Sequence, residues 1–147
     1  MPPCAGPWRA GRMRKIADAG LLIAFLDRLD THHKWAACVF ERESPPFYTA
    51  EPILAEVAAV LGTADEVLRM VETGDLVLSL DLAEEVSAVR GLIVKYKDHP
   101  MDLGDACCVR LAELLPGSVV YTVDRTDFNT YRKNGREWMR GRNEGAE

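Results

Sequence analysis

Four acidic residues stand at positions where they could do chemistry: Asp18, Glu56, Asp105 and Asp124. Asp18 ends the short segment Lys15–Asp18, and Asp124 directly follows the apolar run VVYTV; both segments are typical of strands. Parallel α/β sheets build their sites at the carboxyl ends of the strands. The two aspartates are therefore expected at one edge of a sheet.

Glu56 and Asp105 fall within segments that are typical of helices. Glu56 lies three residues after Ile53 and four before Val60, so it should project from the margin of an apolar helix face. Asp105 lies one turn into a helix that Asp102 is expected to cap. Because the helix dipole also favours acids at that end, a structural and a functional explanation of this pair stay equally open.

Carboxylates gathered in a cleft repel one another, which raises their pKa values and destabilises the fold. A hard divalent cation relieves this repulsion, and Mg²⁺ or Mn²⁺ prefers oxygen ligands. Near a phosphodiester, such an ion can lower the pKa of water and stabilise charge on the phosphate. Other chemistries lack their signatures, since the sequence has no GxxxxGK(S/T), GxGxxG, GxSxG or HExxH motif. The adjacent His32 and His33 are expected at a helix start or on the surface rather than as metal ligands.

The pattern of apolar residues predicts an α/β domain in which strands alternate with helices. Strands are expected at 15–18, 76–80 and 119–123, and helices at 21–29, 31–43, 49–62, from 63 onward, 82–96 and 102–115. This alternation predicts one domain with a central, mostly parallel sheet of four to five strands and helices on both faces. The tail from Asn134 should either form an edge strand around Trp138 or fray.

Capping patterns set the expected helix boundaries. Thr31 and Thr49 are expected as N-caps, and Thr63 with Glu66 has the spacing of a capping box. Pro45-Pro46 should end the second helix. The third helix is expected to bury a stripe made of Ile53, Val57, Val60 and Leu61.

Composition and charge exclude several classes of protein. The 147 residues are 48% hydrophobic and 28% charged, which is typical of a globular chain, and no apolar run has the length of a membrane span. The formal net charge of −5 is uneven: residues 1–15 carry +4, residues 16–127 carry −11 and residues 128–147 carry +2. An acidic body is not typical of a duplex-DNA binder but is compatible with carboxylates that hold cations. We expect a soluble, cytoplasmic protein.

The ends of the chain and the cysteines carry separate expectations. Residues 1–12 are rich in Pro, Gly and Arg and are expected to form a disordered leader, which makes Met13 a candidate native start. Residues 13–136 should then form the domain, and residues 137–147 a basic tail. The four cysteines have no CxxC spacing, so we expect buried thiols in a reducing compartment rather than a disulfide framework.

Four segments, in order and at family-like separations, resemble the motifs of PIN-domain proteins and, more narrowly, of VapC-type toxin ribonucleases: IADAGLLIAFLDRLDTHHKWA, TAEPILAEVAAVLG, HPMDLGDACCVRLAE and VVYTVDRTDF. The resemblance covers Met13 to about Arg136. It implies a PIN-like fold and a catalytic, metal-binding quartet made of Asp18, Glu56, Asp105 and Asp124.

Within that resemblance, Asp18 and Asp105 would be the firmest metal ligands. Asp102 and Asp127 would be nearby reserves, although Asp127 is better explained as the cap of the turn that follows it. Thr122 would orient a carboxylate or a water molecule.

The activity implied by the resemblance is a Mg²⁺- or Mn²⁺-dependent endoribonuclease that leaves 5′-phosphate and 3′-hydroxyl ends. A toxin of this kind would have a cognate antitoxin protein that covers the site, and it would form a homodimer. The basic side chains near the C-terminus could attract RNA or could simply be solvated; they are Arg132, Lys133, Arg136, Arg140 and Arg142.

One position departs from the family pattern. Gly20 stands two residues after the first aspartate, where many members have Asn or Ser, so a supporting hydroxyl or amide is missing. This departure leaves an alternative open: a PIN-fold RNA-binding or protein-interaction module with little or no nuclease activity.

Overall fold

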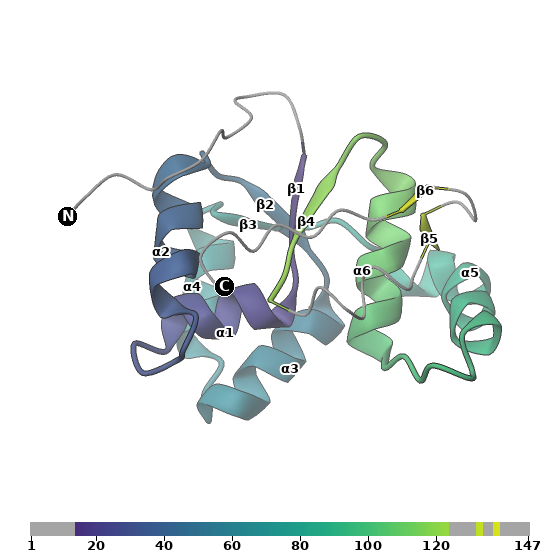
Figure 1. The fold of residues 1–147 in the computed structure, drawn as a ribbon, viewed down its shortest axis with the longest axis horizontal. Helices are drawn as coiled ribbons and strands as arrows, with labels where there is room; N and C mark the ends of the chain where they lie inside the picture. Colours follow the sequence, from purple (N-terminus) through teal and green to yellow (C-terminus); the bar gives the residue numbers. More distant parts are fainter. Residues whose placement is uncertain (1–13, 124–131, 134–136, 139–147) are drawn as a thin grey trace.

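The computed structural model describes residues 14–123, 132–133 and 137–138 (Figure 1). The strands are β1 (Lys15–Ala17), β2 (Phe47–Thr49), β3 (Leu76–Leu78), β4 (Val119–Tyr121), β5 (Arg132–Lys133) and β6 (Glu137–Trp138). The helices are α1 (Ala19–Leu26), α2 (His33–Arg42), α3 (Glu51–Leu61), α4 (Asp65–Glu72), α5 (Leu82–Lys95) and α6 (Leu103–Leu114). None of the helices in this described part is long and apolar enough to cross a membrane.

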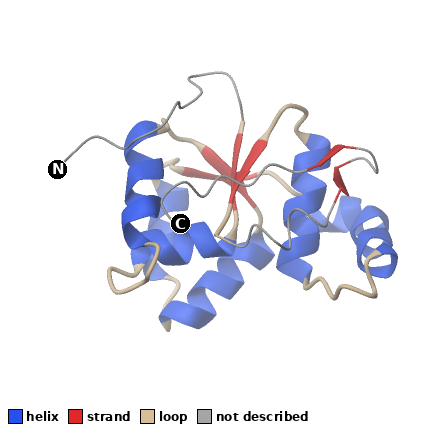
Figure 2. Cartoon of the chain, in the orientation of Figure 1, coloured by secondary structure: helices blue, strands red, loops and turns tan. Residues whose placement is uncertain are grey.

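The central sheet has four strands, all parallel, in the order β3-β2-β1-β4. Helices cover both faces: α1, α2 and α4 lie on one side, and α5 and α6 on the other (Figures 1 and 2). Helix α3 lies below the carboxyl ends of the strands and contacts both α1 and α6. The predicted α/β class is therefore confirmed, and the topology is consistent with a PIN-like fold.

The strands of this sheet are three residues long and mostly apolar, as is typical of parallel strands that helices cover on both faces. Ile16, Phe47, Leu76 and Val120, one from each strand, are at most 1% exposed. They belong to one continuous core that also includes the inner sides of the helices. This core fixes the ends of the strands, where the candidate chemistry lies.

Strand β2 was not among the predicted strands. It is only three residues long, it follows Pro45-Pro46 directly, and it contains Thr49, which was expected as a helix cap. Thr49 is instead fully buried, and its hydroxyl donates a hydrogen bond to the carbonyl of Ala17 in β1 at 3.1 Å. The cap of α3 is Ala50, which has no capping side chain. The Thr49 prediction is therefore wrong.

Two further caps differ from the prediction. Helix α2 begins after His32 rather than at Thr31, and the carboxylate of Asp30 accepts a hydrogen bond from the backbone N–H of His32 at 2.8 Å. The capping box expected at the start of α4 is absent from this described helix, because Thr63 accepts from the N–H of Asp65, two residues on.

The buried face of α3 is shorter than predicted. Ile53 and Val57 are buried as expected, and Leu54 is buried without having been predicted, whereas Leu61 is half-buried and Val60 is 60% exposed, so the buried face ends earlier along the helix. The cap predicted for α6, Asp102, is confirmed, and Asp18, predicted only as the end of the first strand, is also the N-cap of α1. Both of these aspartates belong to the candidate site.

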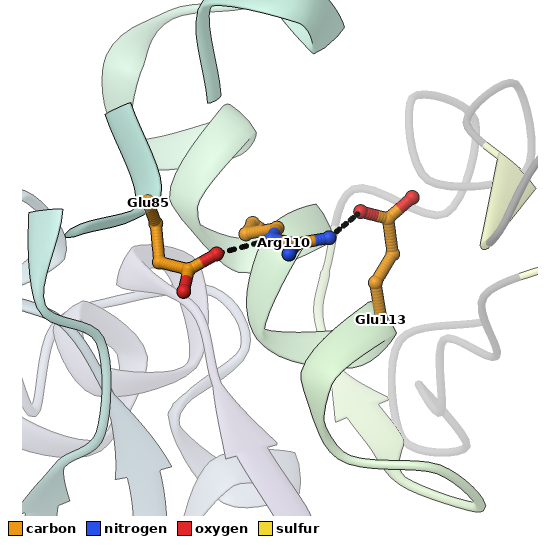
Figure 3. A network of polar contacts seen from close by, with 3 residues as sticks. All are labelled: Glu85, Arg110 and Glu113. Carbon is orange, nitrogen blue, oxygen red and sulfur yellow. Dashed lines mark hydrogen bonds and ion pairs between the residues drawn. The ribbon is translucent and has the colours of Figure 1, made fainter. Parts of the chain in front are cut away.

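Helices α5 and α6 pack against each other around one arginine (Figure 3). Nε of Arg110 in α6 lies 2.7 Å from a carboxylate oxygen of Glu85 in α5, and its Nη1 lies 3.0 Å from Glu113 one turn further along α6. This arrangement ties the two helices together on one face of the sheet.

The cysteines are not all thiols. Cys107 and Cys108 are free and buried, as expected, but Cys38 is disulfide-bonded, so the prediction is wrong for Cys38. Trp138 does lie in a strand, yet that strand pairs with β5 in a separate antiparallel sheet rather than at the edge of the central one. The predicted leader, residues 1–12, lies outside the described residues.

Candidate metal centre

Asp18 stands at the junction of β1 and α1. It directly follows the last residue of β1 and is the N-cap of α1, where one of its carboxylate oxygens accepts a hydrogen bond from the N–H of Leu21 at 2.8 Å. The side chain is buried, with 7% of the residue exposed. Strand and helix together therefore fix this carboxylate at the carboxyl edge of the sheet.

Asp102 and Asp105 form a reciprocal capping box at the start of α6. The carboxylate of Asp102 accepts from the N–H of Asp105 at 2.7 Å, and the carboxylate of Asp105 accepts from the N–H of Asp102 at 3.2 Å. The structural explanation of this pair is confirmed. It does not exclude a functional one, because each bond occupies only one of the oxygens on its carboxyl group.

Glu56 reaches the same place from α3. A methyl group built on Gly104 would lie 2.8 Å from Oε1 of Glu56 and 3.4 Å from Oδ1 of Asp102. The carboxyl group of Glu56 therefore rests against the first turn of α6, beside the capping box. Its place on the helix margin, predicted from the spacing to Ile53, agrees with this direction.

Three of the four predicted site residues line one pocket of about 220 Å³, which we call the acidic pocket. The residues that line it are Asp18, Ala19, Gly20, Ile53, Glu56, Gly104, Asp105, Cys108 and Val123. They come from the end of β1, the starts of α1 and α6, the middle of α3 and the residue that precedes position 124. The pocket therefore collects residues that are far apart in the sequence.

The fourth predicted residue, Asp124, lies outside the described residues, as does Asp127. Thr122 is fully buried next to the end of β4 and does not line the pocket. The histidines are helix-start residues, as expected: His32 is the N-cap of α2, and Nδ1 of His33 lies 2.8 Å from the carbonyl oxygen of Ala24.

Burial and mutual repulsion raise the pKa values of two carboxyls in this region. The pKa of Asp105 rises to about 7, because the group is partly buried and lies close to the charges of Asp102 and Glu56. The pKa of Glu56 is also raised, by burial first and then by Asp102. Within the part of the chain that the structure describes, no lysine or arginine forms an ion pair with Glu56, Asp102 or Asp105.

Two glycines and a cysteine of the pocket were not predicted as functional residues. A methyl group on Gly20 would lie 2.8 Å from Cγ2 of Val123, so the asparagine or serine common in the resembling family has no room here without a shift of Val123. At Gly104, the carboxyl group of Glu56 takes the space that a side chain would occupy. Cys108 lies three residues after Asp105, and this helical spacing could have placed it on the same face.

The donor set suits a hard divalent cation. All three carboxyls are oxygen donors, which Mg²⁺ and Mn²⁺ prefer, and a cation would offset the repulsion that raises the pKa values of Asp105 and Glu56. As the side chains stand, no three histidine, cysteine or acidic residues among those described are close enough to hold one ion. The residues fit such an ion in their chemistry, and binding would require the carboxyls to draw together.

The fold and this pocket define an α/β protein of PIN-like topology with carboxylates gathered at the carboxyl edge of its sheet. In sequence, the chain is similar to Ribonuclease VapC26 of Mycobacterium tuberculosis, with 26% identity over 126 residues that cover 82% of this chain and 93% of that protein. No protein-family model matches the chain. The similarity is distant, and the relative is of the kind whose motifs the four segments resemble.

Proposed function

We propose that this protein is a metal-dependent endoribonuclease and the toxin of a VapBC-type toxin–antitoxin pair. The observation that carries the proposal is the acidic pocket, where Asp18, Glu56 and Asp105 converge from three separate elements. The distant similarity to a VapC ribonuclease along most of both chains supports the same reading. Carboxylates that repel one another in a pocket are costly for a fold, and a cation-dependent reaction explains why they are kept.

In this proposal Asp18, Glu56, Asp105 and Asp124 hold a Mg²⁺ or Mn²⁺ ion. When bound, the ion lowers the pKa of water and stabilises charge on the scissile phosphate. The chain's own contribution is orientation: the N–H of Leu21 holds the carboxylate of Asp18, and the capping box holds that of Asp105. Hydrolysis adds the hydroxyl of one water molecule to phosphorus and breaks the bond to O3′, which takes up the remaining proton. The products carry 5′-phosphate and 3′-hydroxyl ends.

The proposed RNA contacts follow from the charge of the chain, whereas the proposed protein partners follow from the resemblance to VapC-type toxins. The acidic surface of residues 16–127 repels RNA, so the five basic side chains between positions 132 and 142 are the proposed phosphate contacts. Replacing all five should lower both the affinity for RNA and its dependence on salt, and unchanged binding would remove the tail from the mechanism. A cognate antitoxin that covers the acidic pocket and a homodimer complete the proposal.

The competing function is a PIN-fold module that binds RNA or protein with little nuclease activity. The observation that favours it is the spacing of the carboxyls, since no three donors among the described residues are close enough to hold one ion as they stand. Such a module would bind Mn²⁺ weakly and would not harm cells on overexpression.

The deciding experiment compares the wild type with Asp18→Asn and Asp105→Asn on total RNA. Each protein is stripped of metal and of co-purifying partners, and is then assayed with Mg²⁺, with Mn²⁺ or with excess chelator. Cleavage that requires metal and is lost in both variants would support the nuclease. No cleavage by folded, metal-loaded wild type would favour the binding module, and cleavage that survives in both variants would mean that the site is elsewhere or that the activity is a contaminant.

A further inference from the structure

Gly104 occupies an unexpected place for a glycine. It is the second residue of α6, it is buried, and its backbone is not in the left-handed region that favours glycine. Glycine inside a helix is less stable than alanine, because the unfolded chain has more conformational freedom to lose. The backbone of α6 therefore gives no reason for a glycine here, and the reason has to be space.

The space above Gly104 is taken by a carboxylate. A methyl group at this position would lie 2.8 Å from Oε1 of Glu56, closer than real methyl groups approach a neighbour. The other atoms nearby are less constraining: Oδ1 of Asp102 would lie at 3.4 Å and Cγ1 of Ile53 at 4.0 Å, near ordinary contact. Because Gly104 has no side chain, the carboxyl group of Glu56 can lie close to the backbone of α6 at this position.

We propose that Gly104 is a positioning residue for the acidic pocket: by lacking a side chain, it lets Glu56 of α3 lie against the first turn of α6, beside Asp105. The inference rests on the proposed function, because it matters only if Glu56 takes part in holding the ion. Gly104 touches neither the metal nor RNA and acts through Glu56 alone.

The geometry also predicts the kind of damage that a methyl group would do. The atom it meets is the end of a flexible side chain, so Glu56 can rotate away and the fold can keep its core. The pocket would then lose the Glu56 carboxyl while α6 gains a better helix former. Gly104→Ala should therefore unfold at the same urea concentration as the wild type or a higher one, and should bind metal more weakly.

A matched control is present on the neighbouring helix. Gly91 lies within α5, and a methyl group there would meet nothing within 4 Å. Gly91→Ala makes the same change of residue in a helix without touching the pocket. It should raise the urea midpoint and leave metal affinity and RNA cleavage at wild-type values.

The test measures Mn²⁺ affinity by calorimetry on metal-free protein, together with Mn²⁺-dependent RNA cleavage. Gly104→Ala should weaken Mn²⁺ binding about 10-fold, the lower end of what loss of a supporting residue causes at metal sites. In a Glu56→Ala background, the same substitution should add no further loss of affinity or cleavage. If Gly104→Ala alone fails to fold, the double variant should fold, since its clashing carboxylate is gone.

The outcomes separate this inference from the function it rests on. A wild type that binds no Mn²⁺ and cleaves no RNA overturns the proposed function and this inference with it. A wild type that binds Mn²⁺, with a Gly104→Ala variant that binds it equally well, overturns the inference alone. An equal loss with and without Glu56, or a double variant that stays unfolded, also overturns it, because Gly104 would then act by another route.

Discussion

Helix α6 takes part in two clusters of acidic side chains, and among the residues that the structure describes only one of the two clusters includes a cation. At its N-terminus, Asp102 and Asp105 lie beside Glu56 of α3. Further along, Arg110 lies between Glu85 of α5 and Glu113 of its own helix (Figure 3).

Both clusters raise a pKa, but the effect on the charged form of the group is opposite in the two. In the first cluster, burial and repulsion raise the pKa of Asp105 from 3.8 to about 7, so its charged form is less favoured than that of an ordinary aspartate. In the second, burial opposes the charge of Arg110, but its hydrogen bonds to Glu85 and Glu113 outweigh burial and raise the pKa of the guanidinium. The charged form is therefore favoured.

Helix α6 can thus neutralise acidic side chains with an arginine. It does so at Glu85 and Glu113, where the ion pairs connect α5 and α6. Among the described residues, no such cation pairs with Glu56, Asp102 or Asp105. Groups with strongly shifted pKa values gather at functional sites because their function requires an arrangement that costs stability. The contrast favours a structural role for the Arg110 cluster and a functional one for the pocket.

The largest difference should be in activity. Asp105→Asn keeps an oxygen that can accept the N–H of Asp102, so the capping box survives while the charge is lost. Metal-dependent RNA cleavage should fall more than about 100-fold, since loss of groups that merely support metal ligands already costs 10–100-fold. Glu85→Gln is the matched change in the other cluster. This variant should cleave RNA at a rate within about twofold of the wild type, a small change beside the roughly 10–100-fold losses that follow removal of supporting groups at metal sites. Equal losses in the two variants would erase the distinction between the clusters.

The next difference should be in stability, and here the larger effect should come from the Arg110 cluster. Arg110→Met keeps the apolar stem but leaves Glu85 and Glu113, whose side chains are only 22% and 12% exposed, without this cation. The free energy of unfolding should fall by about 2 kcal/mol, because removing one partner of a partly buried ion pair strands the other.

The control for that measurement is an exposed ion pair. Arg69 and Asp65 lie one turn apart in α4, with side chains 70% and 72% exposed. Arg69→Met should change the free energy of unfolding by less than about 0.5 kcal/mol, as is usual for surface pairs. Urea unfolding with chelator present measures both variants. If Arg110→Met costs no more than Arg69→Met, the Arg110 cluster is not what ties α5 to α6.

Local rules explain which parts of this fold were predictable. The N-cap at Asp102 was predicted correctly because an N-cap needs only a short polar side chain before an apolar helix. Asp18 caps α1 by the same rule, although it was predicted only as the end of a strand. Thr31, Thr49 and Thr63 satisfy the same rule in sequence, yet none of them is the N-cap of its helix. The hydroxyl of Thr49, for example, donates to β1, a partner 32 residues away in sequence that no local pattern reveals.

The candidate site was predictable in part for the same reason. Helical spacing gave the direction of Glu56, and strand ends gave the place of Asp18. The contact between α3 and α6 depends on tertiary packing, so the role of Gly104 became visible only when the two helices were seen together. The convergence of Asp124 with the other three stays a prediction.

The smallest effect should be a pH dependence of stability carried by Asp105. Its pKa is about 7 in the folded protein against an ordinary 3.8, so between these values the folded state binds more protons than the unfolded state. The free energy of unfolding of metal-free protein should therefore fall as pH rises from about 4 to about 7. We expect a loss of about 1 kcal/mol, less than the full shift implies, because Asp105 is partly exposed and its charge is screened by water.

Urea unfolding at pH 5 and pH 8, with chelator or with Mg²⁺, tests this origin of the pH dependence. Asp105→Asn should remove the pH-dependent loss, and Asp102→Asn, which can still cap α6, should reduce it by removing a repelling charge. Mg²⁺ should stabilise the wild type at pH 8 more than at pH 5, because protons compete with the cation for the carboxyls. If the wild type and Asp105→Asn lose stability equally across this range, the repulsion lies elsewhere, and the electrostatic contrast between the two ends of α6 would no longer mark the pocket as the functional one.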